Sequence, residues 1–550
     1  MNQFIKSYNL KITPLTPVHI GTDEYYQPGN YVIDTEENAL YSFDSGMAMQ
    51  ALTATERKQL LNIVNDYPSD AMLKKVQGFF HNARNSLMAF SLPPLPVTKG
   101  VNNLYNSRIG AIAQHEGGGK KVINKLEIDR TFYNPIDYKP VLPGSSIKGA
   151  IRTALLDSLN NGKPFKSFTG IRTQLNNELQ KSIFGGSFAT DPMRLISLAD
   201  ASWQAELQQP VCQIKFAVNR KRHPVMHNGK LVEPRGIPKL LECITPHFYQ
   251  SFTGSITLQD IKQINSTKGT PTKQFTIQEI ASACNNFYGD ILHRELKELQ
   301  DRALIDINWK NHLDSHLNGD LKTKLDSGQA FLLRVGRHSG ADSVTLNGVR
   351  SIKILKAKGE SPSYESKPKT WWLAADNVND KQSLLPFGWI LVEINPQLPN
   401  QQLKDWLETS GKNLAIWMQN QSQKQADAKK NVQIRLELEN KKRLAEQAEA
   451  EAANLAAIAE AERMANLSPL QLEFEQLLAK FPVAEHDTKL LQELEKGHWQ
   501  GADAVNVALK VKDLMIQAGK WIPDFNGTND KKLKLKQRCI KVLDFIDTKL

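Results

Sequence analysis

Residues 142–156, Leu-Pro-Gly-Ser-Ser-Ile-Lys-Gly-Ala-Ile-Arg-Thr-Ala-Leu-Leu, narrowly constrain the local fold of this chain. A Pro-Gly turn and two serines, residues that commonly start helices, lead directly into a helical apolar pattern. At 100° per residue the apolar side chains fall on one face, whereas Lys148 and Arg152 lie together at its edge. The pattern predicts a helix that buries one face and carries cations beside its first turn.

The start of this helix is a candidate seat for a phosphate. The first turn of a helix has amide N–H groups without helical acceptors and the positive end of the helix dipole. The residues that would form the seat are Gly144, Ser145, Ser146, Lys148 and Arg152. The alternative is a capped helix on a sheet whose basic residues are only solvated, and the local sequence leaves both interpretations open.

The length of the chain and the distribution of its charge limit the classes of protein to which it can belong. With 550 residues, the chain is long enough for two or three folding units. Its net charge is +11, and nearly all of the excess lies before residue 401. An excess of basic residues in a region of mixed secondary structure indicates that the chain binds a polyanion. Nucleic acid is favoured over a membrane surface as this partner because no basic amphipathic anchor is visible. Charge that only maintains solubility is the alternative.

The cysteines and the apolar runs argue against several other classes. The four cysteines are scattered without a C-x-x-C pair, so we expect reduced, buried thiols, with no disulfide framework and no metal site. No apolar run approaches the roughly 20 residues that span a bilayer, and residues 1–12 lack the apolar centre of a signal peptide. We expect a cytoplasmic protein without a cofactor.

Alternating and helical apolar patterns predict a mixed architecture. The expected strands are residues 9–13, 31–33, 40–43, 194–201, 211–218, 239–245, 254–258, 330–335, 349–355, 371–373 and 387–394. The expected helices are residues 45–64, the helix that starts near residue 145, residues 276–299, and nearly all of the chain after residue 401.

Two further basic segments of the first half are candidate polyanion contacts. Asn228-Gly229 predicts a hairpin turn, and the strand before it leads into Arg220, Lys221 and Arg222. Almost no acidic residue accompanies this hairpin, which favours contact with a polyanion over a merely solvated hairpin.

The second segment is the glycine-rich loop at residues 115–121. Its glycine spacing differs from that of a phosphate-binding loop, the final Ser or Thr is missing, and no buried strand precedes it, so nucleotide hydrolysis is rejected. Lys120, Lys121 and Arg130 could still contact an RNA backbone, and a solvated loop is the alternative.

Four segments resemble the RAMP superfamily of CRISPR-associated proteins: residues 14–21 (Pro-Leu-Thr-Pro-Val-His-Ile-Gly), 142–156, 183–186 and 197–200. More narrowly, residues 1–400 resemble the fifth subunit of the type III-A Csm effector complex. The resemblance implies tandem ferredoxin-like domains, related to RNA-recognition modules, and a subunit that caps the crRNA filament near the 3′ end of the guide. The Gly-Arg-His-Ser-Gly loop at residues 336–340 is similar to the glycine-rich loop of the family's second domain. There, Arg334, Arg337 and His338 could neutralise a phosphate, and an ordinary surface loop is the alternative.

The sequence and the resemblance together predict an α+β chain of four parts. These are a first RAMP, ferredoxin-like domain over residues 1–260, a second over 261–400, a helical linker over 401–467 and a helical C-terminal domain over 468–550. Residues 423–466 contain no glycine or proline and no sustained heptad of large apolar residues, which predicts a solvated helical strut. We therefore expect a chain truncated after about residue 400 to fold.

The expected function is that of a non-catalytic RNA-binding subunit of a type III CRISPR effector ribonucleoprotein, which supports crRNA maturation and antiviral defence. The expected partners are crRNA, target RNA and other RAMP-type subunits. The alternative is a metal-independent CRISPR repeat endoribonuclease with His19 or His223 as the general acid or base. The residues favour a hydrogen-bonded core position for His19 over a catalytic one, since it lies between apolar neighbours and neither histidine has an evident partner.

Overall fold

The computed structural model describes residues 4–65, 70–110, 114–116, 120–122, 126–164, 172–204, 212–231, 238–261, 270–271, 273–355 and 359–547. It divides the chain into two compact units, residues 1–436 (unit 1) and residues 437–550 (unit 2).

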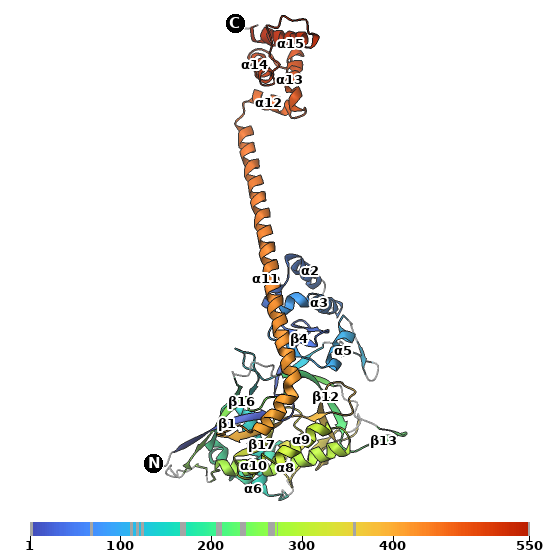
Figure 1. Cartoon of the computed structure of the whole chain (residues 1–550), viewed down its shortest axis with the longest axis vertical. Helices are drawn as coiled ribbons and strands as arrows, with labels where there is room; N and C mark the ends of the chain where they lie inside the picture. Colours follow the sequence, from blue (N-terminus) through green and yellow to red (C-terminus); the bar gives the residue numbers. More distant parts are fainter. Residues whose placement is uncertain are drawn as a thin grey trace. The chain divides into compact units, whose positions relative to one another are not determined.

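Unit 1 contains all of the strands that the structure describes (Figure 1). The strands are β1 (Ile5–Pro14), β2 (Gly21–Tyr26), β3 (Tyr31–Asp34), β4 (Ala39–Ser42), β5 (Leu95–Pro96), β6 (Gln114–Glu116), β7 (Lys120–Val122), β8 (Ile128–Thr131), β9 (Val141–Leu142), β10 (Ile196–Leu198), β11 (Ala201–Trp203), β12 (Cys212–Lys221), β13 (Met226–His227), β14 (Lys230–Leu231), β15 (Lys239–Ile244), β16 (Phe252–Gln259), β17 (Ala330–Arg334), β18 (Ile352–Ile354), β19 (Ser363–Glu365), β20 (Thr370–Ala375), β21 (Leu385–Pro386) and β22 (Trp389–Ile394). The helices that begin in unit 1 are α1 (Ser45–Ala51), α2 (Ala54–Val64), α3 (Asp70–Asn82), α4 (Arg84–Met88), α5 (Lys99–Arg108), α6 (Gly144–Asn160), α7 (Arg172–Phe184), α8 (Ile277–Asp301), α9 (Ile307–Asn318), α10 (Lys322–Asp326) and α11 (Gln401–Ala465).

The larger sheet is built around β1. Its strand order is β17-β22-β1-β16-β11-β9, and β10 also pairs with β16. Ile12 of β1 lies opposite Phe252 on one side and Val392 on the other, and all three side chains are buried. The alternation of Leu10 and Ile12 with polar residues therefore marks a strand with one face on the core, as the sequence predicts. Strands from residues 5, 252 and 389 onward meet in this single sheet.

Helices α6 and α8 cover this sheet, and their apolar faces have the predicted spacing. Ile147, Ile151 and Leu155 of α6 are buried, which confirms the amphipathic helix expected there. Thr276 starts α8 with a reciprocal capping box to Glu279. The two helices are joined where the Tyr288 hydroxyl of α8 donates to the carbonyl oxygen of Ala150, at 3.1 Å.

The second sheet has the order β2-β8-β15-β12-β20-β21. β12 pairs antiparallel with β15 and β20, whereas β15 pairs parallel with β8. The predicted strands over residues 211–218, 239–245 and 371–373 are therefore neighbours in one sheet, together with β8 from residues 128–131. The glycine-rich loop at residues 336–340 directly follows β17 of the larger sheet.

A small sheet, β3-β4-β5, packs against α1 to α4 in a separate apolar cluster. The helix expected over residues 45–64 is in fact two helices, because Thr53 caps the start of α2 through a capping box with Glu56. The partly buried Trp417 of α11 packs against this cluster.

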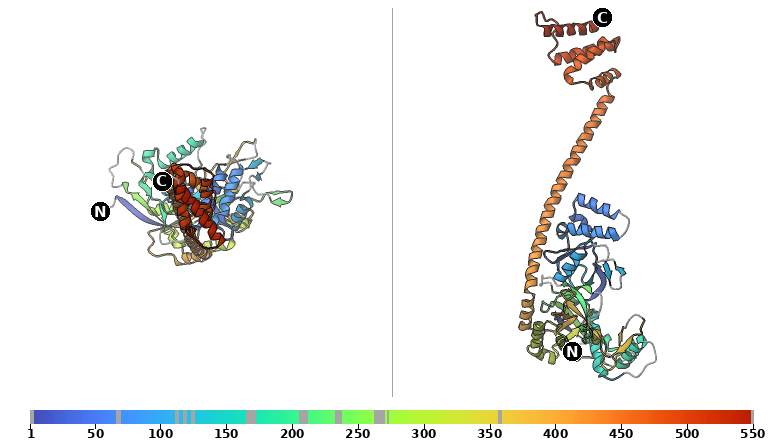
Figure 2. Two further views of the ribbon diagram at one scale, coloured as in Figure 1. Left: turned by 90° about the horizontal axis from the view of Figure 1, so that it is seen from above. Right: turned by 90° about the vertical axis from the view of Figure 1, so that its right-hand side faces the viewer.

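The first part of α11 belongs to the core of unit 1 (Figure 2). Leu403 and Leu407 are buried in the main core. Farther along the helix, Trp417 donates from Nε1 to the carbonyl oxygen of Glu37 at 2.8 Å, and Gln421 accepts from the Tyr41 hydroxyl at 3.0 Å. Arg435 donates to the carbonyl oxygen of Ala51 at 2.7 Å. Residues 440–463, in contrast, are exposed throughout, as the predicted strut requires.

This packing moves the expected end of a stable fragment from about residue 400 to about residue 436. A chain that ends at 436 should keep the thermal stability of unit 1, whereas a chain that ends at 400 should lose it, since each large apolar side chain removed from the core costs roughly 1.5–3 kcal/mol. Thermal unfolding of the two truncated chains measures the difference. Equal melting temperatures would show that the contacts of α11 add nothing to the stability of unit 1.

Unit 2 consists of the remainder of α11 and a cluster of four helices, α12 (Pro469–Leu478), α13 (His486–Glu495), α14 (Ala502–Gln517) and α15 (Asp530–Asp547). Its core contains Leu490, Val507, Met515 and Val542, all of them buried. The buried carboxylate of Asp487 accepts from Lys520 at 2.8 Å and from Arg538 at 3.2 Å. The basic segment at residues 531–538 thus gives at least one of its cations to an internal ion pair.

The α+β class and the helical C-terminal region are confirmed, while the domain boundaries at residues 260, 400 and 467 stay predictions. All four cysteines are buried and free, as expected. Among the described residues, no helix combines the length and the apolar character that a membrane span needs.

Candidate nucleic-acid interface

The backbone at the start of α6 makes more contacts within the chain than its sequence indicates. The amide of Gly144 donates to the Asp200 carboxylate at 2.7 Å, and the amides of Ser146 and Ile147 donate to the carbonyl oxygen of Pro143. A Cβ atom at position 144 would lie 2.5 Å from the carbonyl oxygen of Leu198, so glycine is required for this close approach. Most of the amide donors that a phosphate would use therefore have acceptors within the chain.

Lys148 and Arg152 flank this helix start differently. Arg152 donates to Gln180 at 2.9 Å and forms an ion pair with Asp191 at 2.7 Å, and its guanidinium lies over the ring of Phe184. Lys148 is half-buried and has no ion pair with any described carboxylate. Burial lowers the pKa of Lys148; nearby Asp191 opposes this shift and Arg152 adds to it. Lys148, with the exposed Ser145, is thus the part of the predicted seat that can accept an outside anion.

The predicted arginines of the hairpin are held inside unit 1. Arg220 is buried and donates to the carbonyl oxygens of Val378 and Asp380, at 3.1 and 2.6 Å. Lys221 ends β12, and its carbonyl oxygen accepts from Arg302 at 3.2 Å. Beyond it, the turn at Asn228-Gly229 joins β13 to β14 with positive φ at both residues, which confirms the predicted hairpin turn.

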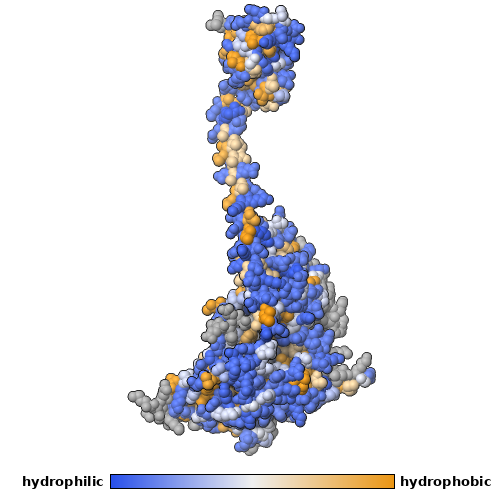
Figure 3. Space-filling model, viewed as in Figure 1, coloured by the Kyte–Doolittle hydropathy of each residue, from blue (hydrophilic) through white to orange (hydrophobic). Residues whose placement is uncertain are grey.

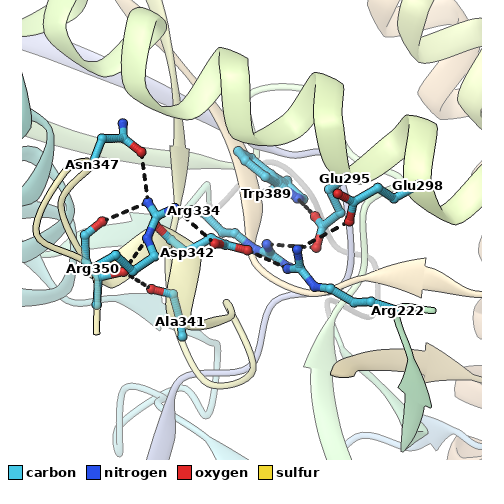
Figure 4. A network of polar contacts seen from close by, with 10 residues as sticks. Arg222, Glu295, Glu298, Arg334, Ala341, Asp342, Asn347, Arg350 and Trp389 are labelled. Carbon is cyan, nitrogen blue, oxygen red and sulfur yellow. Dashed lines mark hydrogen bonds and ion pairs between the residues drawn. The ribbon is translucent and has the colours of Figure 1, made fainter. Parts of the chain in front are cut away.

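Arg222 lies between carboxylates from two parts of the chain (Figure 4). It is buried and pairs with Asp342 at 2.5 Å and with Glu298 of α8 at 3.3 Å. Asp342 also pairs with Arg350 at 3.3 Å, so that one carboxylate joins two guanidinium groups. The ring of Trp371 packs against Arg222.

Arg334 occupies the neighbouring position in the same network (Figure 4). Its side chain is buried, donates to the carbonyl oxygen of Phe387 at 2.8 Å and pairs with Glu295 at 3.0 Å. Glu295 is buried as well and accepts from Nε1 of Trp389 at 2.9 Å. Burial lowers the pKa of Arg334, and the charge of Glu295 opposes that shift. The geometry fits a structural ion pair; contact of Arg334 with RNA stays a prediction.

The loop at residues 336–340 packs against the segment that includes His19. Gly336 has a φ of 82°, and a Cβ atom there would lie 2.4 Å from the carbonyl oxygen of His19. The amide of Arg337 donates to that same oxygen at 2.8 Å. Two of the segments that carry the resemblance, more than 300 residues apart along the chain, are therefore in direct contact.

Two side chains of this loop make different contacts, one charged and one aromatic. The half-exposed Arg337 pairs with Asp129 of the second sheet, and Lys239 lies 3.9 Å from the same carboxylate. His338 has a φ of 64° and stacks on Trp372 with ring centroids 4.8 Å apart. Burial, with the neighbouring positive charge of Arg337, lowers the pKa of His338 to about 3, so this imidazole is neutral at physiological pH.

Arg130 stands in a second internal network, centred on Glu242. It lies over the rings of Tyr26 and Tyr133 and approaches Glu242 at 3.9 Å. Glu242 is buried and accepts from the Tyr26 hydroxyl and from the amide of Thr131, both at 3.1 Å. Burial raises the pKa of Glu242 to about 7, although Arg130 and the hydrogen bonds counteract the shift.

The two histidines of the enzyme alternative lie in different surroundings. His19 is buried, and its Nδ1 is 2.8 Å from the carbonyl oxygen of Glu242. Burial lowers the pKa of His19. His223 is exposed two residues after the end of β12. The hydrogen-bonded core position expected for His19 is confirmed.

Lys120 and Lys121 lie in β7, which pairs with β6, and their side chains are outside the described residues. On the face shown in Figure 3, hydrophilic residues predominate over unit 1 and hydrophobic residues are scattered between them. The structure thus brings Arg222 and Arg334 into one network and Arg130, Arg337 and His338 into one region, and it leaves the start of α6 as a separate site.

The sequence interpretation missed the acidic partners of these arginines and two further cations, Arg294 and Arg350. The sequence could have indicated the buried pairing of Glu295. This residue follows Ile291 by four residues on the apolar face of α8, where a carboxylate must find a buried partner. Asp342 lies in a short 3-10 helix, residues 341–344, and Arg350 in the loop after it, and nothing in their local sequence indicates the pairing.

A match between the sequence and a family model identifies the family of the chain. The family model of the RAMP superfamily matches residues 11–314, more than half of the chain. The chain belongs to the RAMP superfamily. The matched residues of this RAMP protein run from β1 to α9 and include the start of α6, the hairpin after β12 and all of α8.

Solved structures and curated proteins complete the comparison. The RAMP protein is similar to a chain in the cryo-EM structure of a Csm-crRNA-target RNA ternary complex of a type III-A CRISPR-Cas system, with 16% identity and a TM-score of 0.41 over 70% of this chain and 100% of that chain. It is also similar to T. onnurineus Csm5 in a crystal structure, with 16% identity and a TM-score of 0.39 over 70% of this chain and 99% of that chain. No curated protein matches the sequence significantly.

Proposed function

We propose that this RAMP protein is a non-catalytic RNA-binding subunit of a type III CRISPR effector ribonucleoprotein. It caps the complex near the 3′ end of the crRNA and supports crRNA maturation and antiviral defence. The observation that carries the proposal is the RAMP match over residues 11–314, which contains the segments that resemble the fifth Csm subunit. The proposed partners are crRNA, target RNA and neighbouring RAMP-type subunits.

The arrangement of the larger sheet supports a ferredoxin-like unit within this proposal. The chain order β1, α6, β10, β16, α8 and, after β17, β22 follows the β-α-β-β-α-β succession of that fold. In space, β22, β1, β16 and β10 are adjacent in that order. Tandem ferredoxin-like domains remain part of the proposal.

The electrostatics favour RNA backbone contact by lysines and loop cations over contact by the buried arginines. A buried arginine that already pairs with a carboxylate cannot leave it without exposing that carboxylate to an apolar interior. Lys148, Arg337 and Lys239 are instead partly exposed. These three are the proposed phosphate contacts of the two surfaces described above, the start of α6 and the loop at residues 336–340.

Lys148→Glu is expected to weaken crRNA binding while the chain stays folded. Removing one phosphate contact should make the slope of log affinity against log salt shallower by about one unit, and the reversed charge should weaken binding further. The affinity of the purified chain for crRNA, measured at several salt concentrations, tests this, and its melting temperature reports the fold. Lys412→Glu, on the exposed side of α11, is the matched control.

Two results would contradict this proposal. If Lys148→Glu and Lys412→Glu bind crRNA alike, the start of α6 is only a capped helix. If the purified chain cleaves repeat RNA without metal and His19→Ala or His223→Ala abolishes the cleavage, the chain is the endoribonuclease of the alternative interpretation.

A further inference from the structure

A small cavity of about 200 Å³ lies beside the network of Figure 4. The charged side chains that line it are Arg222, Arg294, Arg350, Lys367 and Asp342. This volume is below the roughly 300–1,000 Å³ of pockets that take drug-sized ligands, so it suits a single small group. We call it the arginine pocket.

The charges of the arginine pocket do not balance. Four cations line it, whereas only two carboxylates, Asp342 and Glu298, form ion pairs with them, and the charge of a third, Asp157, acts on Arg350 from farther away. The side chains of Arg294 and Lys367 form no ion pair and no hydrogen bond with any other residue that the structure describes. The pocket therefore has a positive excess and two donors that are available to an anion.

The cations also repel one another. Burial lowers the pKa of Arg350, and the guanidiniums of Arg294 and Arg222 lower it further, whereas the charges of Asp342 and Asp157 oppose the shift. In addition, the Nε donor of Arg222 is buried and has no hydrogen-bond partner among the described residues. A bound anion would relieve the repulsion between these guanidinium groups.

The wall of the pocket is fixed before any ligand arrives. The side chain of Arg350 donates to Thr345 at 2.9 Å and to Asn347 at 3.1 Å. Asn347 is anchored in turn, because its amide donates to Asp157 of α6 at 2.6 Å. Gly348 has a φ of 81° and packs so closely on the carbonyl oxygen of Gly162 that a Cβ atom would lie 2.2 Å away. This part of the wall therefore needs no rearrangement before an anion binds beside it.

We propose that the arginine pocket binds a phosphate group of an RNA strand, an assignment that rests on the proposed function. Guanidinium groups donate in a planar fork that matches phosphate oxygens, and a lysine ammonium adds a compact charge. Arg294 from α8 and Lys367 from the segment after β19 supply the free donors, while Arg222 and Arg350 form the buried wall. The site is distinct from the start of α6 and from the loop at residues 336–340.

The first arm of the test uses inorganic phosphate as the probe on the full-length chain. Phosphate should raise the melting temperature above its value in chloride at equal ionic strength, because a ligand that binds only the folded state stabilises it. Arg294→Glu and Lys367→Glu should each abolish that increase. The controls are Lys297→Glu, three residues farther along α8, and Lys381→Glu, at another exposed lysine, and both should keep it. No increase in the unmodified chain, or an equal loss in the controls, overturns the proposal.

The second arm uses crRNA and identifies the source of the phosphate. Arg294→Glu should weaken crRNA binding about tenfold, as expected for one charge-assisted hydrogen bond, and should make the salt slope shallower by about one unit. If Arg294→Glu abolishes the effect of phosphate but binds crRNA as Lys297→Glu does, the occupant is a free phosphorylated molecule and the assignment to RNA is wrong. If the unmodified chain does not bind crRNA and phosphate still stabilises it, the proposed function fails, and so does the RNA assignment, while the phosphate site remains.

Discussion

Glu295→Ala is expected to lower the free energy of unfolding of unit 1 by about 3–5 kcal/mol. Glu295 and Arg334 are both buried, and the ion pair between them, at 3.0 Å, is the only one that either side chain forms with a described residue. Removing the carboxylate leaves a guanidinium uncompensated in the core and also leaves Nε1 of Trp389 without its acceptor. Urea unfolding of the full-length chain, followed by tryptophan fluorescence, measures the loss.

A double replacement separates the ion pair from simple packing. Glu295→Leu with Arg334→Met removes both charges and keeps the volume, so it should recover much of the stability that Glu295→Ala loses. If the double variant is as unstable as Glu295→Ala, the loss comes from packing and not from an uncompensated charge. If it is stable and still binds crRNA as the unmodified chain does, the predicted contact of Arg334 with RNA is wrong.

Ile151→Asp is expected to prevent stable folding of unit 1. Ile151 is fully buried in the face of α6 that packs under the larger sheet, and aspartate would place an unpaired charge there at a cost of several kcal/mol, about 4 or more. Ser158→Asp adds the same side chain to an exposed position of α6 and should change stability by no more than about 1 kcal/mol. Circular dichroism and thermal unfolding distinguish the two variants. A cooperative transition at an unchanged temperature for Ile151→Asp would contradict the buried face of α6.

Local patterns predicted the elements of unit 1 far better than they predicted its charged contacts. The apolar faces of α6 and α8 follow from a 3.6-residue period, and the turn at Asn228-Gly229 follows from residues that accept positive φ. These signals lie within one or two turns of chain. The backbone hydrogen bonds of these helices and of this turn also join residues close together in the sequence, so the sequence alone is sufficient to predict these elements.

The candidate site could not be predicted to the same depth, because a basic residue has the same local sequence whether it meets a phosphate or a carboxylate. Arg222 pairs with Asp342, which is 120 residues away, and Arg337 pairs with Asp129, which is 208 residues away. Basic charge on the hairpin therefore looked like a polyanion surface, although the structure uses Arg220 and Arg222 internally. The cations that remain available, Arg294 and Lys367, are isolated along the chain and meet only in the fold.

The position of β1 at the centre of the larger sheet also has a consequence for biosynthesis. β1 is made well before its two neighbours, β16 and β22, which begin at residues 252 and 389. At roughly 5–20 residues per second, both edges of β1 wait tens of seconds for their partners during translation. An unpaired apolar strand is a template for association with other chains, and pairings this distant along the chain form slowly. The nascent chain should therefore need a chaperone, or early shielding of residues 5–14, until about residue 394 has left the ribosome.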